Sequence, residues 1–309
     1  MKVLVTGGAG YVGTSLLPVL FKEGHQVRVL DNLLMGGVAL LPFFSHQDFE
    51  FHRGDIRDKA AVAEAVKGVD AIVHLASIVG YPACRKYPKM SREVNVDGTK
   101  LLIEQTPKSV PIIFASTGSG YGKLIGELCT ETTPLNPLSD YGKQKVETEK
   151  LLQDRGNTVI YRFATAFGVS PRMRLDLLIN DFTFRAVKDR SLIVYERHFM
   201  RTFIHVRDMA KAFNFAIKNF DTMKNEVFNV GDSRQNVSKE DICRLILKKV
   251  DYYLHFADVG TDLDQRDYMV SYDKIRQAGF TCDITIEEGI NELIRASQSI
   301  DVTNPYANV

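Results

Sequence analysis

The sequence has little of what several classes of protein require. Its four cysteines, Cys84, Cys129, Cys243 and Cys282, are widely scattered and form no Cys-x-x-Cys pair. This pattern indicates neither a zinc site nor a disulfide framework. Unpaired thiols fit a reducing compartment. We therefore expect no metal and a cytoplasmic location.

The net charge is small, and long apolar runs are absent. Lysine and arginine number 39 and aspartate and glutamate 38, so the formal charge is +1, which gives no field to attract nucleic acid or an anionic membrane. No stretch approaches the roughly 18 uninterrupted apolar residues of a membrane helix. Glycines interrupt the apolar N-terminus that could otherwise be mistaken for a signal peptide. We expect a soluble protein without nucleic-acid or membrane partners.

The chain has the composition of a globular protein. Its 309 residues, 45% of them hydrophobic and 25% charged, can bury a large core in one big domain or two unequal ones. Strand-like and helix-like runs alternate in the first half, which predicts a parallel sheet with helices on both faces. Strands are expected at 2–5, 26–30, 50–52, 71–75, 112–116 and 158–163, and helices at 13–23, 59–66, 91–105 and 141–153.

The pattern changes after Gly168. Helices are expected at 175–188, 209–219 and 239–249, with a strand at 202–206. We predict an α/β fold in which a Rossmann doubly wound parallel sheet, residues 1–168, is joined to a smaller C-terminal substrate-binding domain, residues 169–309. One strand of the second part is expected to return to the sheet. In such a sheet the ligand lies beyond the carboxyl ends of the strands.

A glycine-rich turn follows the first expected strand. The run Val3-Leu4-Val5-Thr6-Gly7-Gly8-Ala9-Gly10-Tyr11-Val12-Gly13 lets backbone N–H groups approach a pyrophosphate at a helix N-terminus. The second strand ends in Asp31, at the distance where an acid binds a ribose 2′-hydroxyl and repels a 2′-phosphate. NAD is therefore favoured over NADP. An ordinary turn or helix-capping aspartate is the alternative for Asp31.

Tyr141 and Lys145 stand four residues apart on an expected helix, so both side chains lie on one face. A free tyrosine, with a pKa of about 10, is a poor base at neutral pH, but a nearby ammonium group favours the phenolate. This pair could remove the proton of a sugar hydroxyl while the carbon loses a hydride. The alternative is an amphipathic helix with a buried tyrosine and a surface lysine.

Together these features resemble the extended short-chain dehydrogenase/reductase family, the NAD-dependent epimerases and dehydratases of sugar nucleotides. The resemblance covers nearly the whole chain. Further matching runs are Gly54-Asp55-Ile56, His74-Leu75-Ala76, Asn95-Val96-Asp97-Gly98-Thr99, Arg201-Thr202-Phe203-Ile204-His205-Val206-Arg207-Asp208 and Asn229-Val230-Gly231. The run from Ser170 to Leu178 is similar to a bacterial subgroup that oxidises C4 of a GDP-linked heptose.

The resemblance implies roles for individual residues. The catalytic group would be Thr117, Tyr141 and Lys145. The NAD site would comprise Gly7, Gly10, Tyr11, Val12, Gly13, Asp31, Asn32, Asp55, Ile56, Leu75, Ala76, Ser77, Asn95 and Lys145. A GDP- or UDP-linked sugar, of hexose or heptose length, would contact Thr117, Ser119, Thr165, Asn180, Arg201 and Arg266. The family also implies a homodimer that pairs the helices at 91–105 and 141–153, and a role in surface polysaccharide biosynthesis.

Two departures from the family pattern bear on the reaction. Gly118 and Ser119 stand where family members that eliminate water carry acids, so 4,6-dehydration is disfavoured unless Glu127 or another carboxylate moves in. Thr165 stands where many relatives have asparagine, so a hexose-specific pocket cannot be assumed. The remaining reaction is oxidation at C4, carried out either by an epimerase, which returns the hydride, or by a net dehydrogenase. A non-catalytic NAD-binding subunit is the alternative from another class.

Four residues have structural interpretations. His74 and His205 lie in expected strands, and we interpret both as buried structural imidazoles because no third ligand is spaced to join them. Thr117 could satisfy a turn instead of a substrate. Cys84 is either an inert buried thiol or part of the sugar pocket.

Overall fold

The computed structural model of the protein describes residues 1–258 and 267–300. Its centre is a seven-stranded parallel sheet in the order β11-β7-β5-β4-β1-β2-β3. The strands are β1 (Lys2–Thr6), β2 (Gln26–Asp31), β3 (Phe49–Arg53), β4 (Ala71–His74), β5 (Ile112–Thr117), β7 (Thr158–Phe163) and β11 (Val227–Val230). The predicted α/β class and doubly wound parallel sheet are confirmed, and six strands lie within one residue of their predicted ends.

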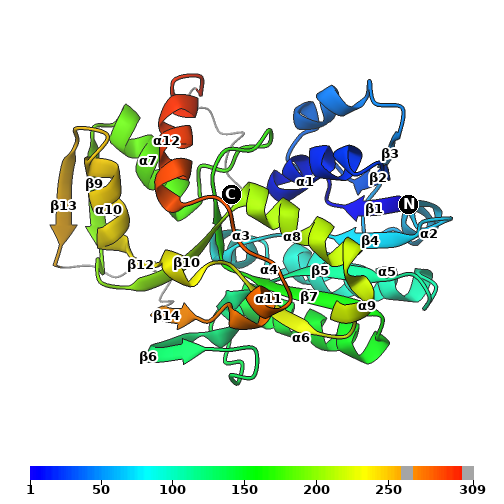
Figure 1. The fold of residues 1–309 in the computed structure, drawn as a ribbon. Helices are drawn as coiled ribbons and strands as arrows, with labels where there is room; N and C mark the ends of the chain where they lie inside the picture. Colours follow the sequence, from blue (N-terminus) through cyan, green and yellow to red (C-terminus); the bar gives the residue numbers. More distant parts are fainter. Residues whose placement is uncertain (259–266, 301–309) are drawn as a thin grey trace.

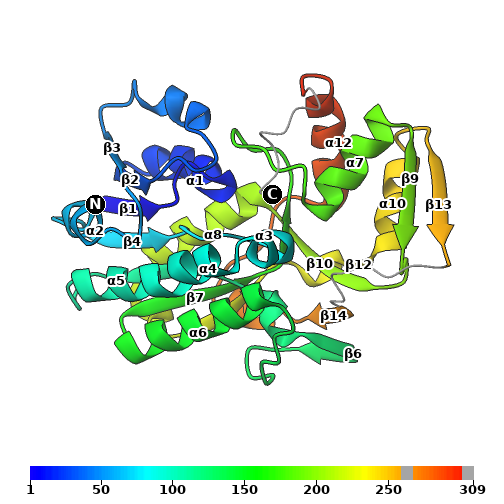
Figure 2. The same ribbon diagram turned by 180° about the vertical axis from the view of Figure 1, so that it is seen from behind.

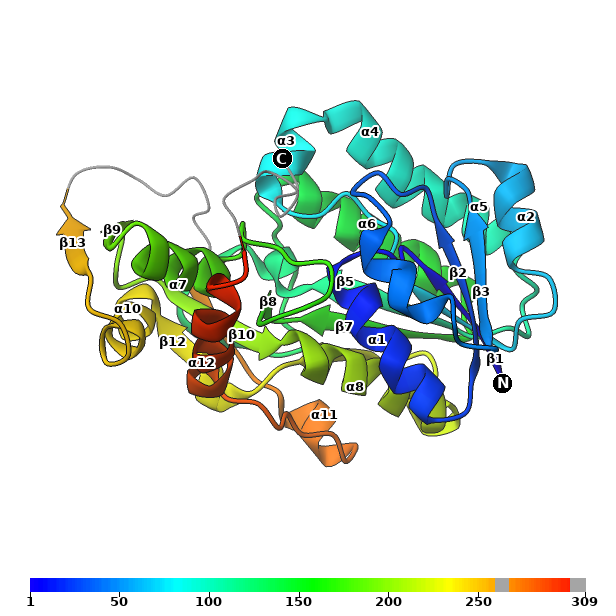
Figure 3. The same cartoon turned by 90° about the horizontal axis from the view of Figure 1, so that it is seen from above.

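Helices cover both faces of this sheet (Figures 1 and 3). On one face lie α1 (Tyr11–Lys22) and α8 (Val206–Lys218), and on the other lie α2 (Lys59–Ala65), α5 (Gly98–Gln105) and α6 (Asp140–Arg155). Successive side chains of a strand point to opposite faces. Accordingly, Val3 and Val5 of β1 enter one buried cluster and Leu4 enters another. Continuous apolar strands are therefore what a sheet covered on both sides requires.

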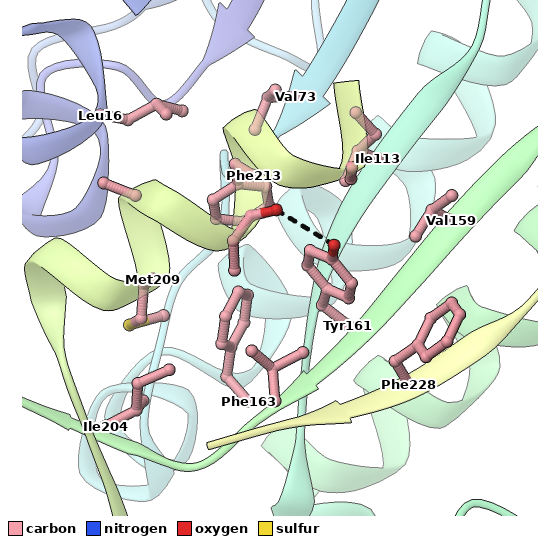
Figure 4. Packing of buried hydrophobic residues seen from close by; sticks show 14 of the residues in the cluster. Leu16, Val73, Ile113, Val159, Tyr161, Phe163, Ile204, Met209, Phe213 and Phe228 are labelled. Carbon is pink, nitrogen blue, oxygen red and sulfur yellow. Dashed lines mark hydrogen bonds between the residues drawn. The ribbon is translucent and has the colours of Figure 1, made fainter. Parts of the chain in front are cut away.

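Residues from the second half of the chain complete the first-half core. Figure 4 shows Phe213 of α8 packed among side chains of the central strands. Its ring centroid lies 5.2 Å from that of Phe163, and Tyr161 donates a hydrogen bond to the carbonyl oxygen of Ala212 at 3.0 Å. Strand β11 also pairs with β7. Elements from beyond residue 168 are thus built into the Rossmann sheet.

The remaining elements form a smaller part at one end of the molecule, seen from two sides in Figures 1 and 2. Short sheets order its strands as β12-β10-β8, β13-β9 and β14-β6. These strands are β6 (Lys123–Cys129), β8 (Thr165–Phe167), β9 (Ser191–Tyr195), β10 (Met200–His205), β12 (Asn236–Ser238), β13 (Tyr253–Ala257) and β14 (Asp267–Val270). Its main helices are α7 (Leu178–Lys188), α10 (Lys239–Leu247) and α12 (Ile286–Ser297).

Short helical segments link these elements. They are η1 (Val38–Phe43), α3 (Tyr81–Lys86), α4 (Pro88–Arg92), η2 (Glu93–Asp97), η3 (Gly118–Tyr121), α9 (Phe220–Met223), η4 (Ser233–Gln235) and α11 (Asp273–Gln277). The single helix predicted at 91–105 is instead α4, a π-helical turn η2 and α5 in succession. The helix predicted from residue 175 begins at Leu178. Among the described residues, no helix has the length and apolarity needed to cross a lipid bilayer.

Candidate active site

The carboxyl ends of six parallel strands open into one cavity. Residues that end these strands or follow them line it, namely Gly7, Asp31, Gly54, Leu75, Thr117 and Ala164 after β1, β2, β3, β4, β5 and β7. Strand order reverses beside β1, between β4 and β2, and such a switch point is where open α/β sheets bind ligands. The sequence prediction of a crevice at this edge agrees with the cavity.

The glycine turn is packed too tightly for side chains. A Cβ atom on Gly7, whose φ is +73°, would lie 2.6 Å from the backbone nitrogen of Ala76, and one on Gly13 would lie 2.5 Å from the carbonyl oxygen of Gly8. Gly10 caps α1 without a side-chain hydrogen bond, so the first N–H groups of the helix receive no side-chain acceptor from it. Donors of this kind at a helix N-terminus fit the pyrophosphate of a dinucleotide.

Asp31 lies at the cavity wall and also forms a turn. Its carboxylate accepts hydrogen bonds from the backbone N–H of Ala9 at 3.0 Å and of Leu33 at 2.8 Å. Burial raises the pKa of Asp31 above its usual value, while these hydrogen bonds and the charge of Arg172 oppose that shift. The turn proposed as the alternative reading is therefore present, and it holds a carboxylate that faces the cavity.

Most of the predicted cofactor residues line the cavity. The cavity is lined by Gly7, Gly10, Tyr11, Val12, Gly13, Asn32, Asp55, Ile56, Leu75, Ala76 and Ser77. Asp55 accepts hydrogen bonds from Asn32 at 2.9 Å and from Arg57, and Arg57 holds the pKa of that carboxyl well below its usual range. Asn95 is not among the lining residues.

Asn95 lies behind the loop that lines the cavity. Its side-chain oxygen accepts hydrogen bonds from Ser77 and from the backbone N–H of Ile78, each at 2.8 Å, and its amide donates to Gln144 at 2.7 Å. The residue is 3% exposed and sits in the π-helical turn η2. Asn95 therefore ties the 77–78 loop to α6, and its predicted direct contact with the cofactor stays a prediction.

Tyr141 and Lys145 lie together at the cavity. Ser139 caps α6 by accepting from the N–H of Gly142 at 3.1 Å, which sets Tyr141 in the first turn. The Nζ atom of Lys145 lies 5.9 Å from the centre of the Tyr141 ring and donates to the carbonyl oxygen of Ala115 at 2.8 Å. Lys145 is only 3% exposed, so the surface-lysine alternative is wrong. Burial lowers its pKa from 10.5 to about 8.

Thr117 ends β5 and lines the same cavity. Its hydroxyl donates to the Oγ atom of Ser119 and accepts from the N–H of Ser119, each at 3.1 Å, so the expected turn interaction exists beside the expected site position. Ser119 is buried and is not part of the lining. A Cβ atom on Gly118 would lie 3.2 Å from the hydroxyl of Tyr268, which leaves little room for a larger residue.

The predicted substrate residues are less closely grouped. Thr165 lines the cavity. Asn180 is fully buried and does not line it; its amide accepts from the N–H of Gly168 at 2.9 Å and donates to the carbonyl oxygen of Arg174 at 2.8 Å. The amide thus holds the loop before α7, and the predicted nucleotide contact of Asn180 stays a prediction. Arg201 is buried on β10 outside the lining, and Arg266 lies outside the described residues.

Both histidines are structural. His74 contacts the hydroxyls of Thr6 at 2.7 Å and Thr99 at 2.9 Å, and burial lowers its pKa to about 3. His205 caps α8 by accepting from the N–H of Arg207. Cys84 is buried outside the lining, and burial raises the pKa of its thiol to about 11. Within ranges 1–258 and 267–300, no group of three or more His, Cys, Asp or Glu residues is placed to hold a metal.

Several lining residues received no role from the sequence. They are Leu34 and Met35 after β2, Arg172 and Arg174 before α7, and Tyr268 of β14. The run containing both arginines carried only a subgroup resemblance. Its position over the cavity depends on contacts with α1, 158 residues earlier in the chain, which no local pattern reports.

Comparison with known proteins identifies the family. The model described as the NAD dependent epimerase/dehydratase family matches residues 3–231. The chain belongs to this family. NAD is accordingly the cofactor, and the protein is an enzyme of the sugar-nucleotide epimerase/dehydratase type, as the sequence predicted. The glycine turn and the lining described above fit that cofactor.

Relatives and solved structures agree with this assignment. A UDP-glucose 4-epimerase from Lactobacillus helveticus is 30% identical over 75% of this chain and 76% of its own. A putative UDP-glucose 4-epimerase from Methanocaldococcus jannaschii is 27% identical over 94% of this chain and 97% of its own. The crystal structure of the Thermus thermophilus UDP-glucose 4-epimerase in complex with NAD superposes with a TM-score of 0.84 at 25% identity, covering 96% of this chain and 99% of that one.

Proposed function

We propose that this protein oxidises the C4 hydroxyl of a nucleoside-diphosphate sugar and returns the hydride to the other face of the carbon, as a C4 epimerase. The main observation in support is the pair Tyr141 and Lys145, held at the mouth of the Rossmann cavity with the ammonium 5.9 Å from the phenol ring. The relatives described above include one named UDP-glucose 4-epimerase and one named putative UDP-glucose 4-epimerase.

In this mechanism Tyr141 takes the proton of the C4 hydroxyl. Lys145 favours the phenolate because its ammonium is buried, where charges interact strongly. One of its three N–H donors goes to Ala115, which leaves two for the phenolate and the cofactor ribose. Thr117, at the end of β5, would turn its hydroxyl proton from Ser119 to this oxygen as negative charge develops on it. The bound NAD supplies a hydride acceptor.

The residues after Thr117 favour epimerisation over dehydration. Loss of water needs an acid to protonate the departing hydroxide, and neither Gly118 nor Ser119 can serve. The hydroxyl of Tyr268, 3.2 Å from where a Cβ atom at 118 would stand, also opposes a carboxylate there. A 4,6-dehydratase is therefore the weaker candidate. A net C4 dehydrogenase is a second candidate, since Thr117, Tyr141 and Lys145 would serve it equally. A non-catalytic NAD-binding subunit is a third candidate.

For the substrate we propose a UDP- or GDP-linked hexose or heptose used in surface polysaccharide biosynthesis in the cytoplasm. The relatives named for UDP-glucose support a UDP-hexose. The run from Ser170 to Leu178 supports a GDP-linked heptose, and Thr165 in place of asparagine means that a hexose-specific pocket cannot be assumed. Four buried cysteines that form no disulfide suit a reducing compartment.

Product masses distinguish these candidates. The purified enzyme is incubated with UDP- and GDP-hexoses and heptoses, and products are separated and weighed. An epimerase gives an isomer of unchanged mass, a dehydrogenase a product lighter by two hydrogens, and a dehydratase one lighter by a water. No turnover of any sugar, with NAD bound, would support the non-catalytic subunit and overturn the proposal.

We also propose a homodimer formed through α6 and the segment from α4 to α5. These helices lie side by side on one face of the sheet (Figures 2 and 3). A two-pronged ion pair between Arg92 and Glu147, at 2.9 and 3.0 Å, links them. A monomer in light scattering at micromolar concentration would refute the dimer.

A further inference from the structure

Arg172 is a buried cation at the cavity wall. It is 7% exposed and lines the cavity, yet its Nε and Nη2 atoms have no hydrogen-bond partner among the described residues. Leaving such donors unpaired in a protein interior is costly, and nearly all buried polar groups have partners. The arginine is therefore placed for a partner that is not part of this chain's described residues.

The neighbouring charges do not meet this need. Arg174, two residues later, donates from Nε to Asp176 at 3.1 Å. Burial and then the charge of Arg174 lower the pKa of Arg172, Asp176 and Asp31 oppose that shift, and neither carboxylate accepts a hydrogen bond from Nε or Nη2. The guanidinium is thus prepared for an additional anion.

Contacts with α1 fix where this anion would lie. The N–H of Arg172 donates to the hydroxyl of Thr14 at 3.3 Å, and Ser170 donates to the carbonyl oxygen of Tyr11 at 2.7 Å. Helix α1 has twelve residues and begins at Tyr11, directly after the glycine turn. Its positive end and Arg172 therefore attract the same negative group.

We propose that Arg172 donates to the pyrophosphate of bound NAD, so that the 168–177 loop closes over the cofactor. A nucleotide sugar also carries a pyrophosphate, but the contacts with the first turns of α1 and the proximity of Asp31 favour the dinucleotide. An arginine fork suits phosphate oxygens because it offers two parallel N–H donors. The proposal needs only NAD binding, so it stands or falls independently of the C4 reaction.

The test measures binding by the full chain after its resident nucleotide has been removed. NAD, ADP, adenosine and UDP are titrated calorimetrically into the parent protein, Arg172→Gln and Arg172→Lys. We expect Arg172→Gln to weaken NAD and ADP by about 10- to 100-fold, the value of a charge-assisted hydrogen bond. Adenosine, which lacks phosphate, and UDP should bind as before, and Arg172→Lys should fall between.

A matched control is Arg185→Gln on α7, an exposed arginine whose partners Asp181 and Asp189 lie on or beside the same helix; it should leave all four affinities unchanged. The proposal is overturned if ADP binds Arg172→Gln as tightly as the parent. Equal loss of adenosine affinity would show that the loop has collapsed, and loss of UDP affinity alone would assign Arg172 to the nucleotide sugar; both results also overturn it.

Discussion

Lys145 combines a functional position with a cost in stability. Its ammonium is buried at the site, and its pKa is lowered from 10.5 to about 8 by burial. Below pH 8 both the folded and the unfolded chain carry the charge, so the folded state bears the full cost. Between pH 8 and 10.5 the unfolded chain binds more protons, so this group's contribution to stability rises with pH.

Replacing Lys145 should therefore stabilise the fold, while the ammonium that favours the Tyr141 phenolate is lost. We expect Lys145→Met to raise the free energy of unfolding at pH 7 by about 2 kcal/mol, after loss of the bond to Ala115. The gain should shrink between pH 8 and 10.5, as urea unfolding across this range would measure. Exposed Lys143→Met, on the same helix, is the control. A gain that persists unchanged at pH 10.5 would contradict the burial argument.

Tyr141 bears the proton transfer in the proposed mechanism. Tyr141→Phe should lower turnover by about 10²- to 10⁴-fold, the usual contribution of a general base, while NAD and the sugar nucleotide still bind. Steady-state kinetics and nucleotide titration measure the two effects separately. Tyr87→Phe, at a residue 42% exposed, serves as control. Unchanged turnover in Tyr141→Phe would remove the mechanism.

At the scale of elements, the sequence predicted strands better than helix interruptions. Apolar runs bounded by polar turns mark the inner strands β1, β4, β5 and β7, because strands covered on both faces are mostly apolar, whereas the half-buried edge strand β3 alternates apolar and polar residues. The π-helical turn at Glu93–Asp97 was missed. Within this turn Asn95 makes hydrogen bonds with the 77–78 loop and with α6. Periodicity along one helix contains no information on those partners.

The hydrogen bonds of Asn95 should contribute measurably to the free energy of unfolding. Asn95→Ala leaves the N–H of Ile78 and the side-chain carbonyl oxygen of Gln144 without this partner, so we expect a loss of about 2 to 3 kcal/mol and weaker NAD binding. Urea unfolding and NAD titration measure these. Asn219→Ala, whose amide donates to the carbonyl of Phe215, should cost less. If both variants lose equal stability, Asn95 has no special role in positioning the loop.

At the scale of the whole molecule, the boundary predicted at residue 168 divides the chain but not its core. Strand β11 extends the sheet beside β7, and α8 covers the face that carries Val73, Ile113 and Tyr161. A sheet with an open edge and an exposed apolar face tends to associate. Residues 1–168 therefore depend on β11 and α8 to cover the sheet edge and one apolar face.

We expect the fragment 1–168 to be aggregated or to bind hydrophobic dyes strongly, unlike the full chain. Removing β11 exposes the backbone of β7, and removing α8 uncovers the aromatic cluster around Phe163. Size-exclusion chromatography and dye fluorescence on both proteins make the comparison. A monomeric fragment with cooperative unfolding would instead support residues 1–168 as an independent domain.

The sequence by itself determined the features whose cause is local. The glycine turn, the strand that ends in Asp31 and the four-residue spacing of Tyr141 and Lys145 follow from backbone sterics and helix geometry. The tertiary structure alone decided that Lys145 is buried, that Asn95 and Asn180 lie behind the cavity wall, and that Arg172 reaches the first turns of α1. Those positions depend on packing between segments far apart in the chain, which periodicity and spacing do not record.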